Sequence, residues 1–107
     1  MQRFGQIIGL DPASTEAYER YHRQVWPGVL AMIQACNIRN YTIFRFGDLL
    51  FAYYEYVGSD HAADMARMAA DPETQRWWAI MEPMQRPLDA RAAGEWWHRL
   101  PEAFHVD

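Results

Sequence analysis

A tyrosine and a histidine lie four residues apart in the stretch EAYERYHRQVWP, residues 16–27. On a helix this spacing brings side chains to one face with Cβ atoms about 5–6 Å apart, so Tyr18 and His22 would place a phenol beside an imidazole. Histidine has an unperturbed pKa of about 6.5 and can move protons at neutral pH. The pair could therefore be a general acid beside a substrate-positioning hydroxyl. Taken alone, the pair is better interpreted as a packed core face.

Tryptophan occurs twice as an adjacent pair, at Trp77-Trp78 and at Trp96-Trp97. Neighbours on a helix point about 100° apart, so one ring of Trp77-Trp78 can pack inside while the other lines a cleft. Indole faces suit the apolar C–H faces of a sugar, and the indole N–H can donate to a hydroxyl. Packing in the core and in a dimer contact is an equally good interpretation of this pair. We expect Trp96-Trp97 in a strand, on opposite faces, and interpret it as packing.

Three further side chains could take part in a site. Tyr41 begins a predicted strand and would contribute if its face points toward the helix that carries His22. Arg76 could bind a carboxylate, although a surface position on the helix is more typical. Glu55 interrupts an apolar strand, where a carboxylate costs free energy unless it is paired or protonated. We expect it in a dimer ion pair in preference to a role as catalytic base.

Several kinds of chemistry are excluded by residues that the chain lacks. All ten basic residues are arginine, which excludes Schiff-base chemistry, a pyridoxal phosphate anchor and a phosphate-loop lysine. The two serines lie outside any G-x-S-x-G setting, and no G-x-G-x-x-G occurs. The four histidines and Cys36 form no metal-ligand spacing. Either the protein carries out acid–base chemistry with His, Tyr, Asp and Glu side chains, or it catalyses no reaction.

Length and composition indicate one domain, residues 1–107, that is half hydrophobic and 15% aromatic. A core of this size is modest, so we expect a second copy of the chain to cover the remaining apolar surface. The net charge of −4, without a basic cluster, argues against nucleic acid as a partner. No apolar run approaches the roughly 20 residues of a membrane span, and nothing resembles a signal peptide. Cys36 is alone, and we expect the protein in the cytoplasm.

The first half of the chain predicts a strand, a helix and a hairpin. Residues 3–10 form the strand, and Asp11-Pro12 suits the start of a helix that Pro27 should kink or divide before it ends near residue 37. Residues 39–58 contain two β-rich runs around Gly47-Asp48, typical of a type II′ turn. The second run is apolar on both faces, so we expect helices to pack on one face and a second sheet on the other. One face would hold Leu50, Ala52, Tyr54 and Tyr56, and the other Phe51, Tyr53 and Val57.

The second half predicts two helices and a last strand. Ser59 should cap the first helix and Asp71-Pro72 should begin the second, which carries both residues of Trp77-Trp78. Pro83 and Pro87 then break the chain, and residues 94–100 form the strand. The order β-α-β-β-α-β indicates a ferredoxin-like α+β fold with an antiparallel sheet. Helices on one face leave the other bare, so two such sheets packed together would form a dimeric α+β barrel.

Four short motifs follow one another in a set order: YERYH with VWP (18–27), NY (40–41), DLLFA (48–52) and QRWW (75–78). In this order and at these separations the chain resembles the L-rhamnose mutarotase family along nearly its whole length. The resemblance implies a homodimeric α+β barrel that interconverts the α and β anomers of L-rhamnopyranose without a metal or organic cofactor. It implies His22 as proton donor and four aromatic residues in contact with the sugar: Tyr18, Tyr41, Trp77 and Trp78.

Mutarotation suits the side chains that are available. One group protonates the ring oxygen, another removes the proton of the anomeric hydroxyl, and reclosure gives the other anomer. The base is left open: Tyr18 is a poor base unless its pKa of about 10 is lowered, and a carboxylate or a bound water is an equal candidate. HRQVW (22–26) departs from the family's H-N-P-I-W, and residues 84–95 have no clear counterpart, so another 6-deoxy sugar such as L-fucose is a candidate substrate. Two alternatives remain: a cofactor-independent monooxygenase on the same barrel, and a non-catalytic ligand-binding or dimerisation module.

Overall fold

The computed structural model describes all residues, 1–107. Three long strands form the centre of an antiparallel sheet: β1 (Gln2–Leu10), β2 (Ile38–Phe46) and β3 (Leu49–Tyr56). The spatial order of the sheet is β2-β3-β1-β4, which is that of a ferredoxin-like fold. Gly47 takes a φ of +57° at the first central position of the hairpin between β2 and β3, where a type II′ turn needs it. The predicted fold class is confirmed.

Two short strands share the edge of the sheet beside β1. β4 (Gln85–Arg86) pairs with Gly9 and Leu10, and β5 (His98–Leu100) pairs with residues 5–7 nearer the start of β1. Gly9 permits the close approach of β4, because a Cβ there would lie 2.6 Å from the Arg86 carbonyl oxygen. The sequence predicted only one strand after the second half's helices, and β4 was missed.

The predicted last strand, residues 94–100, was wrong in its bounds, since β5 begins only at His98. Trp96 and Trp97 precede it in a turn rather than on opposite faces of a strand. The carboxylate of Glu95 holds this turn by accepting hydrogen bonds from the Ala92 amide (2.7 Å), the Arg99 amide (3.2 Å) and His98 Nδ1 (2.9 Å). These bonds turn the backbone at the tryptophans, whose residue type alone favours a strand.

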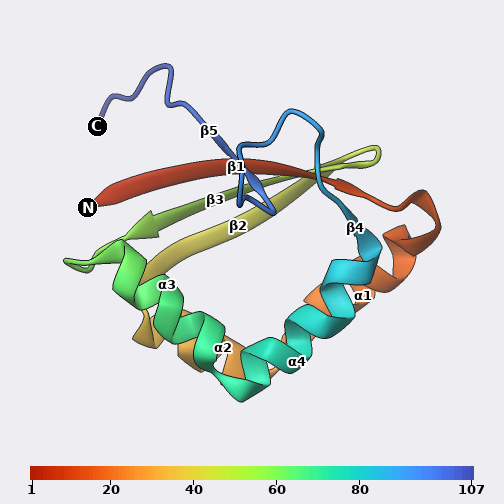
Figure 1. Ribbon diagram of the computed structural model, residues 1–107, viewed down its shortest axis with the longest axis horizontal. Helices are drawn as coiled ribbons and strands as arrows, with labels where there is room; N and C mark the ends of the chain where they lie inside the picture. Colours follow the sequence, from red (N-terminus) through yellow and green to blue (C-terminus); the bar gives the residue numbers. More distant parts are fainter.

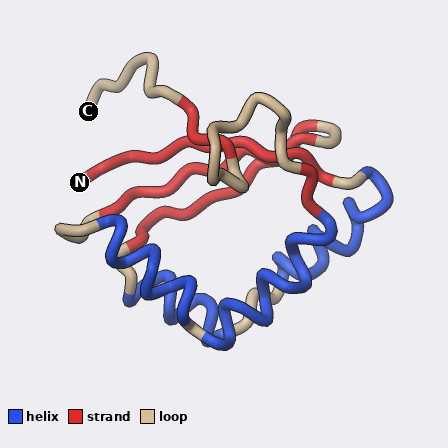
Figure 2. Tube along the Cα trace, in the orientation of Figure 1, coloured by secondary structure: helices blue, strands red, loops and turns tan.

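Four helices cover one face of the sheet (Figures 1 and 2). α1 (Thr15–Arg23) follows a 3-10 turn at Pro12–Ser14, and α2 (Pro27–Ala35) begins at Pro27, which divides the first helical stretch as predicted. α4 (Pro72–Met81) is capped by Asp71, which accepts from the Thr74 amide at 2.9 Å. No helix is long enough and apolar enough to cross a membrane.

The N-cap of α3 (His61–Ala70) is Asp60 and not Ser59, so that prediction was wrong by one residue. The Asp60 carboxylate accepts from the Ala63 amide at 3.1 Å. The Asp60 amide in turn donates to the Tyr56 hydroxyl at 2.9 Å, which holds the chain at the end of β3. This anchoring to the sheet sets the start of the helix one residue later.

The core lies between the helices and the inner face of the sheet. β3 alternates strictly, and the four side chains predicted to share one face, Leu50, Ala52, Tyr54 and Tyr56, are all buried. Burial of each large apolar side chain contributes about 1.5–3 kcal/mol to folding. The buried side chains form two clusters. The first cluster is Ile8, Leu10, Tyr18, Val29, Leu50, Trp77, Met81 and Met84, and the second is Phe4, Ile38, Tyr54 and Tyr56.

The outer face of the sheet carries no helix. Phe44 and Phe46 of β2 are 63% and 76% exposed there. Glu55 lies on this face as well, where it accepts hydrogen bonds from the Tyr53 hydroxyl (2.7 Å) and from Asn40 Nδ2 (2.8 Å), which together lower its pKa. The carboxylate is therefore ionised and held by its own chain.

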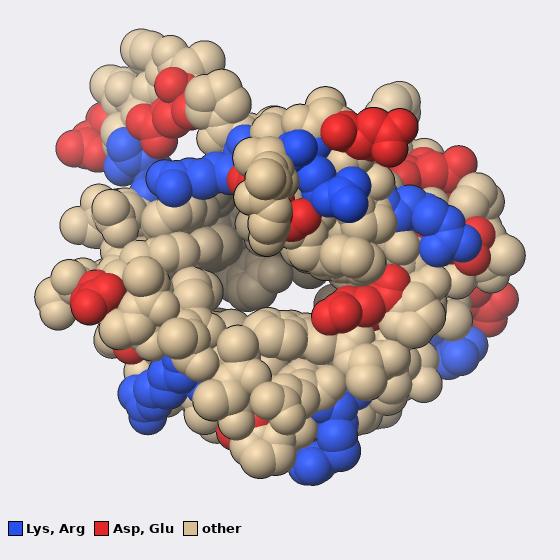
Figure 3. Space-filling model, viewed as in Figure 1, with Lys and Arg blue, Asp and Glu red and all other residues tan.

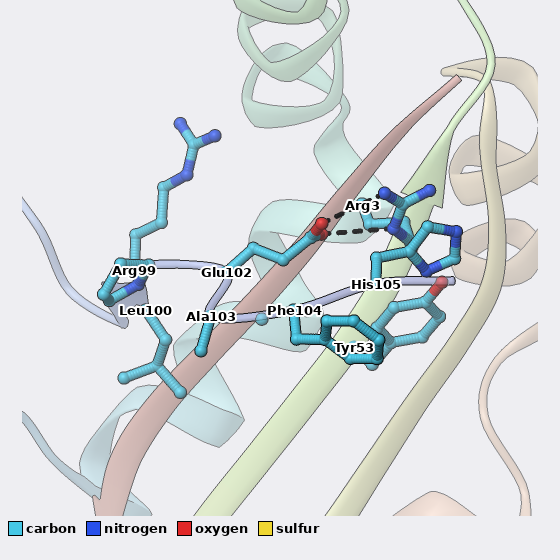
Figure 4. A pocket seen from close by; sticks show the side chains of 10 residues that line it. Arg3, Tyr53, Arg99, Leu100, Glu102, Ala103, Phe104 and His105 are labelled. Atoms are coloured by element: carbon cyan, nitrogen blue, oxygen red, sulfur yellow. Dashed lines mark hydrogen bonds and ion pairs between the residues drawn. The ribbon is translucent and has the colours of Figure 1, made fainter. Parts of the chain in front are cut away.

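The C-terminal residues 101–107 run beside this outer face (Figure 1). Arg3 donates to both carboxylate oxygens of Glu102, at 3.1 Å each. Tyr53, Phe104 and His105 border the same hollow of about 500 Å³ between tail and sheet (Figure 4). Phe104 is 80% exposed, so this end of the outer face is also apolar and open.

Candidate active site

A cavity of about 850 Å³ lies between the inner face of the sheet and the helices. Figure 3 shows the hollow between the two layers, open to solvent on this side. Its size falls in the range of small-molecule sites, and hydrophobic side chains form most of its wall. The structure brings all five predicted site residues to this one cavity: Tyr18, His22, Tyr41, Trp77 and Trp78.

His22 is held by its neighbours in one orientation. Its Nδ1 lies 2.7 Å from the backbone carbonyl oxygen of Tyr18. A carbonyl can only accept, so Nδ1 carries the hydrogen and Nε2 is left free to exchange a proton. The imidazole stacks on the Tyr18 ring at a centroid distance of 4.4 Å and meets the edge of Trp77 at 5.4 Å. Burial lowers the pKa of His22, and the carbonyl bond opposes this shift.

The Tyr18 side chain is buried in the wall of the cavity, and 3% of the residue is exposed. Its hydroxyl accepts a hydrogen bond from Gln85 Nε2 at 3.1 Å. Burial raises the pKa of the phenol, and the bond from Gln85 partly opposes this effect. The hydroxyl therefore keeps its proton at neutral pH, and Tyr18 is a hydrogen-bond donor rather than a base.

A β-bulge sets the direction of Tyr41. Arg39 pairs with Glu55 and Thr42 with Tyr53, which leaves two residues of β2 opposite Tyr54. The extra residue is Asn40, whose φ of +51° is in the left-handed region that asparagine tolerates.

The Tyr41 ring consequently lies on the inner side, 5.7 Å from the ring of Tyr54. Burial of the Tyr41 hydroxyl raises its pKa above the ordinary value. The residue as a whole is 41% exposed, because the cavity that the ring lines is open to solvent.

The adjacent tryptophans of α4 form one wall. Trp77 is buried and meets the rings of Tyr21 at 6.0 Å and Trp26 at 5.2 Å edge-on, in addition to His22. Trp78 is half-buried and packs on the same core cluster. Both rings line the cavity, so the pair combines packing with a cavity surface. Arg76 of the same helix is exposed and does not line the cavity.

Sequence reasoning missed the contribution of the segment after α4. Gln85, Trp96 and Trp97 also line the cavity, and Trp96 Nε1 donates to Gln85 Oε1 at 2.7 Å. The tryptophan pair was interpreted as packing alone. The proline at position 87 and the glycine at position 94 indicate a loop. They were the one feature of the sequence from which a loop beside the cavity could have been predicted.

Two carboxylates line the cavity, those of Glu19 and Glu82. Glu19 forms an ion pair with Arg45 of β2. Arg23 and Gln24, where the motif after His22 departs from the family pattern, are exposed and do not line the cavity.

Tyr54 links the cavity to a second histidine. Its hydroxyl lies 2.9 Å from Nε2 of His61, the first residue of α3, and the Phe4 ring stacks on both. The pairing joins a strand to the following helix, so the spacing of residues within one element does not reveal it. Burial lowers the pKa of His61, which therefore is a neutral acceptor for the tyrosine near neutral pH.

Comparisons with known proteins show the family of the chain. Residues 3–106 match the L-rhamnose mutarotase family. An L-fucose mutarotase of Xanthomonas campestris is 41% identical over 110 residues, covering 97% of this chain and 87% of the relative. An L-rhamnose mutarotase of Oceanobacillus iheyensis is 29% identical over 111 residues, with both chains covered completely.

Solved structures agree on the fold. The crystal structure of an L-rhamnose mutarotase from Formosa agariphila superposes over the full length of both chains with a TM-score of 0.78 at 20% identity. The tetracenomycin F2 cyclase of Streptomyces glaucescens has the same fold at a TM-score of 0.63 and 17% identity. The family match covers almost the whole chain and favours neither alternative function. The protein is therefore a member of the L-rhamnose mutarotase family.

Proposed function

We propose that the cavity opens and recloses the ring of L-rhamnose or of a close 6-deoxyhexose such as L-fucose, with His22 as proton donor. Family membership makes the protein an aldose mutarotase, an isomerase that interconverts α and β anomers. The observation that carries the assignment of the site is the convergence of five side chains, from three separate segments of the chain, on one cavity that contains an imidazole whose Nε2 has no partner within the chain.

Ring opening needs one proton to be added to the ring oxygen and one to be removed from the anomeric hydroxyl. His22 acts in its protonated form, with a hydrogen on each ring nitrogen: Nε2 gives its proton to the ring oxygen, the bond from that oxygen to C1 breaks, and the anomeric hydroxyl loses its proton to a base. The open aldehyde rotates about the C1–C2 bond. On closure the former ring oxygen attacks C1 and returns its proton to Nε2, and the anomeric oxygen regains a proton, so no net proton is consumed.

The remaining side chains hold the sugar. The hydroxyls of Tyr18 and Tyr41 keep their protons at neutral pH because burial raises their pKa, so both can donate to sugar oxygens. The faces of Trp77 and Trp78 suit the C–H faces and the methyl group of a 6-deoxy sugar. The base is a carboxylate or a water molecule held in the cavity, whose two carboxylates are Glu19 and Glu82.

The identity of the sugar is a separate question. The relative at 41% identity is an L-fucose mutarotase, whereas the L-rhamnose mutarotase relatives are 27–30% identical. This difference favours L-fucose, so both sugars are needed as substrates in any test.

We also propose that the enzyme is a homodimer joined through the outer faces of two sheets. Exposed aromatic side chains on a face without helices are typical of an interface, and Phe44, Phe46 and Phe104 are all more than half exposed. The ionised Glu55 would lie near this interface, held by Tyr53 and Asn40.

Saturation-transfer NMR between the anomers of each sugar tests the proposed function. We expect the protein to accelerate exchange of at least one sugar, and His22→Ala to abolish the acceleration. No acceleration for either sugar would disprove the activity. Full acceleration by His22→Ala would disprove the role of the histidine.

A further inference from the structure

Gln85 is a buried glutamine whose two amide ends are both hydrogen-bonded, and 7% of the residue is exposed. Trp96 Nε1 donates to its Oε1 at 2.7 Å, and its Nε2 donates to the Tyr18 hydroxyl at 3.1 Å. An indole N–H can only donate, so the amide atom that faces Trp96 must be the oxygen. The amide nitrogen therefore faces Tyr18, and the orientation of Gln85 follows from chemistry rather than from a choice between two similar atoms.

This orientation determines where the Tyr18 proton points. An amide N–H₂ group has no lone pair to accept a hydrogen bond, so the Tyr18 oxygen accepts and its own hydrogen must point elsewhere. The bond from Gln85 is the only one that the Tyr18 hydroxyl forms within the chain. Tyr18 is a lining residue of the cavity and no other group of the chain accepts its hydrogen, so the partner left for that hydrogen is an acceptor bound in the cavity.

We infer that Gln85 is a positioning residue of the mutarotase: it turns the Tyr18 hydroxyl so that the phenol donates to a sugar oxygen in the cavity. The inference rests on the proposed function, since it concerns how Tyr18 meets the sugar. Gln85 acts through Tyr18 and does not itself take part in proton transfer. By its second bond it also ties the turn that carries Trp96 to the wall of the cavity.

Gln85→Glu separates this role from a merely structural bridge. The substitution keeps the shape of the side chain and can still accept from Trp96. A carboxylate can only accept, so Tyr18 would donate to it and would no longer present its hydrogen to the sugar. The direction of one hydrogen bond is reversed while the bridge itself remains.

The experiment measures kcat and KM for anomer exchange by NMR, together with Tm, for Gln85→Glu, Tyr18→Phe and the double variant. Gln75→Glu is the matched control, because Gln75 is exposed on α4 and bonds only to the Ala69 carbonyl oxygen. We expect a loss of about tenfold or more in kcat/KM for each single variant at residues 18 and 85, in the same parameter, and no further loss in the double variant.

Gln85→Met covers the case in which a buried carboxylate prevents folding. It keeps the volume and removes the donor, and its loss of kcat/KM should also vanish in the Tyr18→Phe background. Wild-type kcat/KM in a folded Gln85 variant, or equal losses with and without the Tyr18 hydroxyl, would overturn the inference. A wild-type protein that exchanges neither sugar would instead remove the proposed function, so the two failures are distinct.

Discussion

The imidazole of His22 stacks on the ring of Tyr18 at 4.4 Å and donates through Nδ1 to the backbone carbonyl of the same residue at 2.7 Å. One residue thus fixes both the plane and the tautomer of the histidine. The carbonyl of residue 18 is already the acceptor side of a helix turn, so this contact needs no additional element of the fold. The free Nε2 is the nitrogen that can exchange a proton.

The first prediction concerns the histidine itself. We expect His22→Ala to lower kcat/KM by about 10²–10⁴-fold, the usual contribution of a positioned general acid. Anomer exchange by NMR measures the effect. His105→Ala is the matched control, because His105 bonds to Asp107 in the C-terminal tail, outside the cavity. Equal activity of both variants would contradict the role of His22.

The second prediction is a pH profile. Burial places the pKa of His22 below its ordinary value of 6.5. A donor must carry its proton, and the protonated fraction falls as pH rises through that lowered pKa. We expect kcat/KM to fall with rising pH in a limb centred below pH 6.5, and this limb to be missing in His22→Ala. A rate that instead rises over the same range would identify His22 as the base.

The third prediction concerns the turn beneath Trp96. Three hydrogen bonds lower the pKa of Glu95 from 4.5 to about 2. Because the folded pKa lies below the unfolded one, the stabilisation is complete above pH 4.5 and is lost as pH falls toward 2. We expect the Ala92 and Arg99 amides to exchange hydrogen faster over this range, measured by NMR.

Glu95→Gln should produce faster exchange of the same amides already at neutral pH. Glu16→Gln is the control, since Glu16 has only an exposed ion pair with Arg20 on α1. If the two variants protect the Ala92 and Arg99 amides equally, the carboxylate does not hold the turn.

The fourth prediction concerns the outer face of the sheet. We expect Phe44→Glu and Phe46→Glu to shift the protein from dimer to monomer at micromolar concentration, because a charge would have to be buried between two sheets. Sedimentation velocity measures the assembly. Ala79→Glu, exposed on the helical side, should leave the dimer intact. A wild-type monomer, or dimers in all three variants, would contradict the proposed interface.

Most of the fold could be predicted from local features of the sequence. The Asp-Pro pairs at 11–12 and 71–72 and the hairpin at Gly47-Asp48 place elements through contacts between neighbouring residues, which a sequence displays directly. A two-residue strand such as β4 has no period to detect, so its pairing with β1 and the position of Gln85 were out of reach. The turn at Trp96 likewise depends on hydrogen bonds to one carboxylate that composition does not reveal.

The site could be predicted in part for the same reason. Tyr18 and His22 share a helix face by spacing alone. The bond from His22 Nδ1 to the Tyr18 carbonyl depends on the orientation of the ring and was not predicted. The hydrogen bond between Tyr54 and His61 could not be predicted, because it depends on the path of the chain from β3 into α3. The direction of the Tyr41 side chain depends on the bulge at Asn40, and the pattern of residue types along β2 does not predict a bulge.

That bulge changes which residues of β2 point inward, from even-numbered to odd-numbered ones. Before it, an even-numbered residue, Ile38, points inward; after it, the odd-numbered Ile43 and Arg45 do, opposite the inward Ala52 and Leu50. If β2 alternated strictly from Ile38 without a bulge, the even-numbered Phe44 and Phe46 would point into the cavity. Because the bulge accommodates Asn40 as an extra residue, the two phenylalanines stay on the outer face and the cavity remains separate from the outer aromatic surface.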